Sequence, residues 1–525
     1  MTLPRIRKAL LQKRYAATEA AAIRKKAIAI SGAPSAIGAV PDRGVATPED
    51  HVFSREIGCT RRIFQLKPFL TTSQLEGLAY RIRTLTKNEA LNSILIATDS
   101  SHPEDGLPSM LHDRNYPFLQ HESVDEGFPP QPDHKFYVSG GYDPLTLYQQ
   151  SAERVQMHLS HLMDVALAVR GSSGGSKIPT ISVPHGHFHD GAFALFGMGT
   201  YVLATRETSF SITNPSKGLS LDPVGLSYIL PRLGQEFNQP SANYTGCGMI
   251  MALMGYKANA EDMMEVGLAT NYVETPRVIS LLENTLSQLP PWNQQALIKN
   301  PIQYHGELEP THDHNAEFRN YVVAEAIHNF SSYRADGADI WTTSDRDAFL
   351  MEKDPSLELD HVPWHSMRSS NLVDYAATFD AIFKTETTLM GIHERLKEIA
   401  GRVTNDPEEQ EGIDVASDFC RRLESQSPLA VSAVYRLLRE GTKPLETLQS
   451  CMEREKLVQT NLYTKEDFAA WAKARIAGQV GEAFSGWKHR SIHEVSDDEV
   501  TELVESPKLV SGRTRLASIG KLGEQ

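Results

Sequence analysis

The sequence is poor in cysteine. It has four, Cys59, Cys247, Cys420 and Cys451, and no two of them have the spacing of a CxxC pair. Disulfide-rich secreted domains and structural zinc sites both require closely spaced cysteines. We therefore expect neither a disulfide framework nor a zinc knuckle, and the pattern favours a reducing compartment such as the mitochondrial matrix.

Long apolar runs are also missing. No stretch of about 18 consecutive apolar residues occurs, so we expect no membrane-spanning helix and no membrane partner. Apolar residues make up 40% of the chain and charged residues 22%, which is typical of a globular protein. The 525 residues are enough for two or three domains, or for one domain with large additions.

Acidic residues are nearly absent from the first forty positions. This segment holds eight Lys or Arg and one acid, Glu19, so its net charge is +7, and the chain's total of −14 leaves −21 for the remainder. Its Arg-, Lys- and Ala-rich composition is typical of a mitochondrial presequence, the alternative being a basic tail. If it is retained, it is the best candidate for contact with nucleic-acid phosphates.

The periodicity changes along the chain. Strand and helix signals alternate to about residue 275, whereas almost everything from Asn371 to Pro507 has helical period, which predicts a β/α core followed by a helical region. We expect four parts. They are a basic segment over residues 1–40, a core over 41–345 with an insertion at 100–134, a helical region over 346–505 and a basic tail over 506–525.

Several individual elements can be predicted from local patterns. Residues 61–66 and 91–99 are expected to form strands. Residues 71–85 are expected to form an amphipathic helix, with Ser73 and Glu76 at the spacing of a capping box.

A second helix is expected from Pro144 to Val169, with Asp143 as its N-cap. The glycine run 170–177 that follows does not match a phosphate-binding loop, because Ser176 stands where a glycine is required before the lysine and the run follows a helix.

A collinear series of motifs resembles a known family. Its members here are SGGYD, IPTISVPHG, FSITNPSKGLSLD, YILPRL and GYKANAEDMMEVGLATNYV. Together they resemble the crotonase (enoyl-CoA hydratase/isomerase) superfamily. The stretch SPLAVSAVYRLLREGTKPLETLQSCMEREKLVQ further resembles the C-terminal region of 3-hydroxyisobutyryl-CoA hydrolases, which plain hydratases lack.

The resemblance implies an α/β fold, a spiral of ββα turns closed by a C-terminal α-helical region. It also implies that a thioester carbonyl is held by two backbone N–H groups, an oxyanion hole. By position these amides belong to Gly141 and Gly191. The alternative is that both glycines only close tight turns. No cofactor is expected, unless a coenzyme A thioester binds because the ancestral pocket is retained.

The catalytic part of the pattern is altered. Asn214 replaces the glutamate that serves the hydrolases as base or nucleophile, and a carboxamide neither accepts a proton near neutral pH nor forms an acyl anhydride. Asp222 matches a further acid of the family and is the candidate residual acid. The segment after it is one residue longer than in the family, which leaves the direction of its side chain open.

Other positions near the predicted site also depart from the family. Tyr142 takes the place of an acid that is displaced to Asp143, and His189 and Asp190 interrupt a glycine-rich turn. His185, His187 and His189 alternate as metal ligands on a strand would, but they run into that turn, and the THDHN stretch at 311–315 is an ordinary polar loop by default. We expect no metal site.

Two hypotheses remain. In the first, the chain is a mitochondrial hydrolase-like protein with an eroded active site that serves as a structural component. The resemblance extends to hydrolase-like proteins of the mitochondrial small ribosomal subunit. Its partners would then be proteins of that assembly, with rRNA contacted through the basic termini. In the second, the chain is an active 3-hydroxyisobutyryl-CoA hydrolase of valine breakdown that uses Asp222 or Asp190.

Overall fold

The structure is a computed structural model. Residues 51–525 form one compact unit. Within it the structure describes residues 52–57, 60–65, 69–98, 138–171, 178–184, 186–233, 245–273, 276–289, 291, 321–331, 333–334, 371–478 and 484–504.

Several predicted features lie outside the described residues. They are the basic segment 1–40, the insertion 100–134, most of the glycine run, His185, the THDHN stretch and the tail 506–525. The predicted boundary between core and helical region also falls in an undescribed interval, between residues 334 and 371. These domain limits therefore stay predictions.

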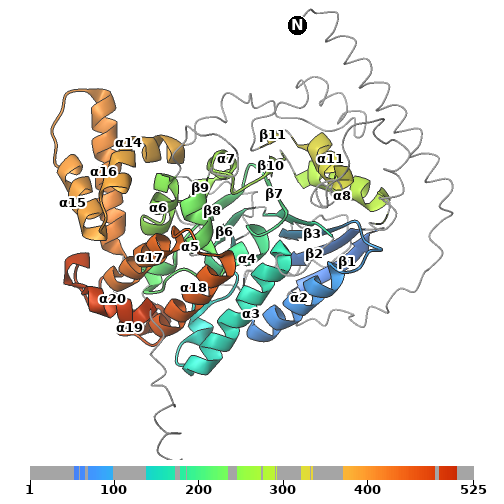
Figure 1. The fold of residues 1–525 in the computed structure, drawn as a ribbon, viewed down its shortest axis with the longest axis horizontal. Helices are drawn as coiled ribbons and strands as arrows, with labels where there is room; N and C mark the ends of the chain where they lie inside the picture. Colours follow the sequence, from blue (N-terminus) through green and yellow to red (C-terminus); the bar gives the residue numbers. More distant parts are fainter. Residues whose placement is uncertain are drawn as a thin grey trace, which may run out of the picture. The chain divides into compact units, whose positions relative to one another are not determined.

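Two sheets form the centre of the compact unit (Figure 1). The larger runs in the order β1 (Val52–Ile57), β2 (Thr60–Gln65), β3 (Ser93–Thr98), β5 (Thr180–Val183), β7 (Tyr201–Ala204), β10 (Asn271–Tyr272) and β11 (Tyr333–Arg334). Its strands from β2 to β10 are parallel, and antiparallel strands flank them at both edges. Every residue of β5 is buried, as expected for a strand covered on both faces.

The smaller sheet runs in the order β4 (Val138–Ser139), β6 (His187–His189), β8 (Ser209–Ser211) and β9 (Ala258–Asn259). Because side chains alternate along a strand, its two faces differ in character. Phe188 and Phe210 pack in the core with ring centroids 5.0 Å apart, whereas His187 and His189 lie on the opposite face. The sequence prediction of the family's mixed α/β architecture is confirmed.

Helix α2 (Thr72–Leu85) packs beside α3 (Ala152–Arg170). The helix predicted over 71–85 is confirmed, but its capping box consists of Thr71 and Gln74, so the assignment to Ser73 and Glu76 was wrong. Thr71 takes the cap because its own backbone is extended and its side chain reaches the third helical amide.

The single helix predicted from Pro144 to Val169 is divided. Asp143 does cap a helical turn, accepting the Leu145 N–H at 3.0 Å, but this turn is the 3₁₀ helix η3 (Pro144–Leu147). The backbone leaves helical geometry there, Gln149 has a positive φ of 63°, and Ser151 caps α3. This division matters because η3 begins two residues after Tyr142, which lies at the predicted site.

The C-terminal region is helical as predicted. Its helices are α14 (Asn371–Thr385), α15 (Leu389–Ala400), α16 (Pro407–Ser425), α17 (Pro428–Gly441), α18 (Leu448–Tyr463), α19 (Glu466–Ile476) and α20 (Asp497–Val504). Helix α18 packs on α3 and on the short helix α5 (Leu226–Ile229), so the late helices share one apolar core with the early part of the chain. None of the helices described is both long and apolar enough to span a bilayer.

Candidate functional site

The two glycines predicted as amide donors lie together. Gly141 follows β4 in a left-handed conformation, with a φ of 78°. A Cβ added to it would lie 2.5 Å from both the carbonyl carbon of Gly191 and the nitrogen of Ala192. Only glycine permits this approach, because a side chain would collide with the facing backbone. The conformation also allows the alternative role, that of closing a turn.

Asp222 faces these glycines. It is 1% exposed, and a Cβ added at Gly191 would lie 3.2 Å from its Oδ2 atom. The extra residue after Asp222 therefore does not turn its side chain away from the predicted site.

Asn214 begins the 3₁₀ helix η5 (Asn214–Lys217) directly beyond β8 and is 1% exposed. Its side chain interacts with Asp222, although its Nδ2 atom completes no hydrogen bond of ordinary geometry with the described residues. The structure thus brings all four candidate residues, Gly141, Gly191, Asn214 and Asp222, into one place, which we call the cradle. Their catalytic roles stay predictions.

A tyrosine fills the cradle. The Tyr142 side chain is 2% exposed, and its ring atoms would lie 3.0 and 3.1 Å from a Cβ added at Gly191. Its hydroxyl donates to Oδ1 of Asp222 at 2.6 Å. Tyr463 of α18 donates in turn to the Tyr142 hydroxyl at 3.1 Å. Two tyrosine hydroxyls and a carboxyl thus satisfy one another beside Gly191.

The protonation of Asp222 follows from this enclosure. Burial, followed by the nearby charge of Asp190, raises the pKa of its carboxyl to about 6, while Tyr142 and Asn214 act in the lowering direction. Burial likewise raises the pKa of Tyr142 well above its ordinary value, and the charge of Asp222 adds to this. At pH 7 the tyrosine is therefore neutral and the carboxyl, whose pKa lies about one unit lower, is mostly ionised.

Asp190 organises the strand end that presents Asn214. Its Oδ1 accepts the N–H groups of Thr213 at 2.7 Å and Asn214 at 3.1 Å. Its Oδ2 accepts the Thr213 hydroxyl at 2.5 Å and Lys217 Nζ at 3.0 Å, and lies 2.9 Å from His189 Nδ1. Burial alone would raise the pKa of Asp190, but Lys217, His189 and Thr213 outweigh it and hold the pKa below its usual range. Both oxygens of this carboxylate therefore have hydrogen-bond or ion-pair partners.

Of the alternating histidines, the structure describes His187 and His189. His187 and His189 do share a face, with ring centroids 5.8 Å apart. The two ring nitrogens of His187 lie 3.0 Å from Ser209 Oγ and 3.1 Å from Ser211 Oγ, and burial lowers its pKa to about 3, so the ring is neutral. Across the described residues, no group of three His, Cys, Asp or Glu side chains is placed to hold a metal ion.

Sequence reasoning missed three residues of α18. Gln459 Nε2 donates to Asp222 Oδ1 at 3.0 Å, Tyr463 reaches Tyr142, and Glu455 accepts backbone N–H groups close to the cradle. The sequence does contain a pattern that could have identified these three residues. They recur every four residues on the helix face that also carries Val458 and Leu462, so a helical projection shows polar groups on a buried face.

Comparison with known proteins agrees with the fold. A family profile described as enoyl-CoA hydratase/isomerase matches residues 134–335 and 357–504. The chain is 29% identical over 118 residues to a mitochondrial 3-hydroxyisobutyryl-CoA hydrolase of Xenopus laevis, covering 22% of this chain and 28% of the relative. It is 25% identical over 161 residues to the human protein of that name, covering 30% and 37%. The chain thus spans less than half the length of these relatives.

Two solved structures align over most of the chain. A carnitinyl-CoA dehydratase from Mycobacterium thermoresistibile gives a TM-score of 0.52 at 16% identity, covering 88% of this chain and 98% of that one. An enoyl-CoA hydratase from Rhodobacter sphaeroides 2.4.1 gives 0.52 at 14% identity, covering 87% and 98%. At this level of identity the likeness establishes the shared fold alone.

Proposed function

Because the chain belongs to the enoyl-CoA hydratase/isomerase family, we propose that it keeps the crotonase fold without thioester hydrolysis and serves as a structural component of the mitochondrial small ribosomal subunit. The observation that carries the non-catalytic part is the buried Tyr142 side chain, which occupies the cradle and binds its remaining acid, Asp222.

Chemistry supports this proposal at two points. Hydrolysis of a thioester needs a base or nucleophile beside the held carbonyl, and the carboxamide of Asn214 supplies neither. A preformed oxyanion hole also has to be empty before a carbonyl oxygen can reach its N–H donors. Here the space beside Gly191 is taken by the Tyr142 ring.

The location and the partners are part of the proposal. The curated relatives are named as mitochondrial proteins, and the +7 charge of the first forty residues suits import into the matrix. The remaining −21 favours contact with basic proteins, and the basic termini are the parts suited to rRNA.

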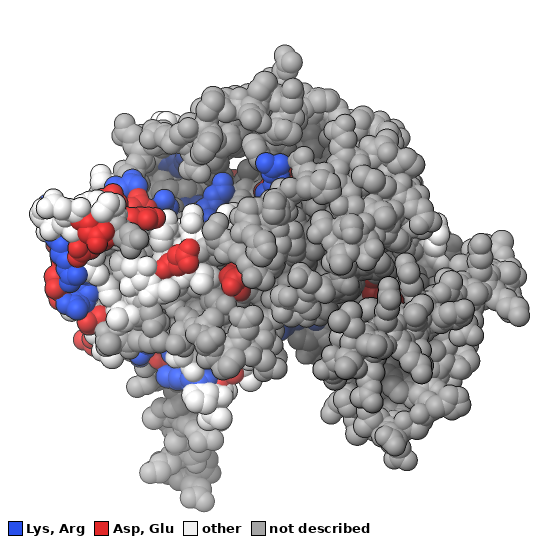
Figure 2. Space-filling view, turned by 90° about the horizontal axis from the view of Figure 1, so that it is seen from above, with Lys and Arg blue, Asp and Glu red and all other residues white. Residues whose placement is uncertain are grey.

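The end of the molecule formed by α14, α15 and α16 carries charges of both signs (Figure 2). Figure 2 shows acidic and basic side chains interspersed over the end formed by α14, α15 and α16. Several are paired there, as in Lys397 with Glu424 and Arg422 with Asp418. Such a mixed surface suits a protein neighbour better than a phosphate backbone.

Sedimentation of mitochondrial extract tests the structural role. The tagged full chain is expected to comigrate with the small ribosomal subunit on a sucrose gradient at physiological salt, and to leave that position when the subunit is dissociated with EDTA and high salt. Recovery of the chain only in the free protein fractions at physiological salt would refute the proposal.

One observation favours a second function. Asp222 faces the cradle, and its pKa of about 6 suits an acid–base group near neutral pH. In this reading Tyr142 moves aside and Asp222 serves as the base of a 3-hydroxyisobutyryl-CoA hydrolase. That function requires turnover that is lost in Asp222→Asn and rises with pH through about 6.

A further inference from the structure

Helix α18 carries a stripe of buried polar side chains. Glu455, Gln459 and Tyr463 recur at four-residue intervals and therefore share one face of the helix. Glu455 and Gln459 are fully buried and Tyr463 is 8% exposed. Burying such groups costs free energy unless each finds a hydrogen-bond partner, so their partners indicate what this face does.

Gln459 and Tyr463 bind the cradle directly. Gln459 donates to Asp222 Oδ1 at 3.0 Å through Nε2 and accepts the Ser220 N–H at 2.7 Å through Oε1. One side chain thus fixes both the carboxyl and the backbone beside it. Tyr463 meets the Tyr142 hydroxyl, which itself donates to Asp222. The tyrosine that fills the cradle is held in place from α18.

Glu455 holds the segment that follows Asp222. Its two carboxylate oxygens accept the N–H groups of Gly225 at 2.8 Å and Ser227 at 2.6 Å. A side chain on one helix thereby satisfies two amides at the start of another, α5, which lacks a side-chain cap of its own.

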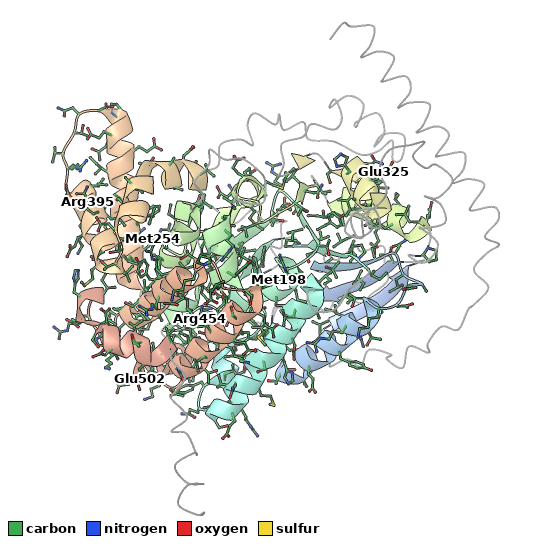
Figure 3. All side chains as sticks on the ribbon, viewed as in Figure 1. Met198, Met254, Glu325, Arg395, Arg454 and Glu502 are labelled. Carbon is green, nitrogen blue, oxygen red and sulfur yellow. The ribbon has the colours of Figure 1, made fainter. Side chains whose placement is uncertain are left out.

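The segment also packs closely against α17 and α18. A Cβ added at Gly225 would lie 2.3 Å from Leu448 of α18, and one added at Gly441, the last residue of α17, would lie 1.9 Å from the Ser227 carbonyl oxygen. Close packing of this kind transmits displacement, because the packed elements have to move together. Figure 3 shows α18, on which Arg454 is labelled, against the core elements it covers.

We infer that α18 is a latch that keeps the cradle closed. Its polar stripe binds Tyr142, Asp222 and the segment 218–227, so the cradle opens only when this helix moves away from that segment. The inference rests on one part of the proposed function, the filling of the cradle by Tyr142. It does not depend on whether the chain hydrolyses thioesters. It implies that a partner displacing the C-terminal helices would also uncover Gly141 and Gly191.

Hydrogen exchange of the full chain tests the latch. In Gln459→Ala, exchange across residues 218–227 is expected to be at least ten times faster than in the parent chain, whereas residues 93–98 of β3 keep their rate. Gln449→Ala, an exposed position on the same helix, is the matched control and should change neither segment. Tyr463→Phe removes one hydroxyl and should accelerate exchange in residues 141–147, which carry Tyr142.

The possible results distinguish failure of the latch from failure of the proposed function. Unchanged exchange in 218–227 for Gln459→Ala and in 141–147 for Tyr463→Phe would overturn the latch, as would an equal acceleration in β3, which would indicate general destabilisation. Hydrolysis of an acyl-CoA by the parent chain, together with the expected exchange pattern, would overturn the proposed function and leave the latch standing.

Discussion

Asp190 shows how a single residue changes the chemistry of the strand end before the cradle. It adopts a φ of 49°, a region that non-glycine residues rarely occupy. The strain is offset by hydrogen bonds to Thr213, Asn214 and Lys217. A glycine would be relaxed there but would leave those groups without this partner. Asp190 therefore acts as a structural anchor in the turn that precedes Gly191.

Removing this anchor should be costly. Asp190→Ala removes the buried carboxylate that Lys217 Nζ binds at 3.0 Å, and breaking a buried ion pair typically costs about 3–5 kcal/mol. Urea unfolding measures the change in the free energy of unfolding. The control is Asp164→Ala, which removes only an exposed pair with Arg83 and should cost less than about 1 kcal/mol. Similar losses in the two variants would show that Asp190 is not the anchor.

Stability should depend on two buried acids. Burial is the main cause that raises the pKa of Asp222 to about 6 and of Glu455 to about 7. Between pH 4 and 7 these two groups keep protons in the fold that they release in the unfolded chain, so their contribution to the free energy of unfolding falls as pH rises, by about 1.4 kcal/mol per unit of pKa shift for each group. The buried rings of His187 and His158, whose pKa values are lowered to about 3 and about 4, act in the opposite direction over the same range. The lowered pKa of Asp190 acts below this window.

Thermal unfolding at pH 5 to 8 checks this dependence. Relative to Asp222→Asn, the parent chain should lose thermal stability between pH 5 and 6, because Asp222 begins to release its proton in the fold there and an amide does not titrate. Identical slopes for the two chains over that interval would mean that Asp222 is ionised in the fold at pH 5.

At the scale of elements, contacts between the late helices and the segment that precedes Asp222 help to fix the geometry of the cradle. Ser427 at the start of α17 donates its N–H to the Pro215 carbonyl at 3.1 Å, and Gly218 packs against the backbone of Asp467 and Phe468. The C-terminal helices thus pack directly against the segment that carries Asn214 and form part of the surroundings of the cradle. A substitution that displaces these helices should therefore also displace residues of the cradle.

A substitution at Gly441 tests the close packing of the C-terminal helices against the segment 218–227. Gly441→Ala would place a methyl group against the Ser227 carbonyl, and overpacking of this kind costs about 1–3 kcal/mol. Gly412→Ala in α16 is the matched control. The nearest atom to its added Cβ is 4.0 Å away, so the helix preference for alanine should stabilise the chain by about 0.5–1 kcal/mol. Denaturant unfolding compares the two, and equal effects would contradict the close packing.

How much the sequence predicts depends on the range of the interactions. The strand at β3 and the helix at α2 follow from local periodicity and were predicted. The break after η3 was missed, because it depends on the backbone at Gln149 rather than on residue type. The residues of the predicted cradle followed from motif order. The tyrosine that fills it, and its contacts on α18, join positions more than 300 residues apart, which no local pattern contains.

For the whole molecule, fold and activity have to be argued separately, since one fold hosts many functions. The family profile and the aligned structures establish the crotonase fold. They leave open what this member does, which depends on Asn214, Asp222 and Tyr142. The structural role proposed for the mitochondrial ribosome uses the outside of the molecule, so it is compatible with a closed interior.

Release of coenzyme A tests the central claim most directly. The full chain, in molar excess over 3-hydroxyisobutyryl-CoA, is incubated at pH 8, where Asp222 is ionised, and free thiol is followed over hours. The account predicts release at the rate of buffer alone, since Tyr142 occupies the cradle and Asn214 is no base. Release at a rate proportional to the concentration of the chain, and abolished in Asp222→Asn, would contradict it.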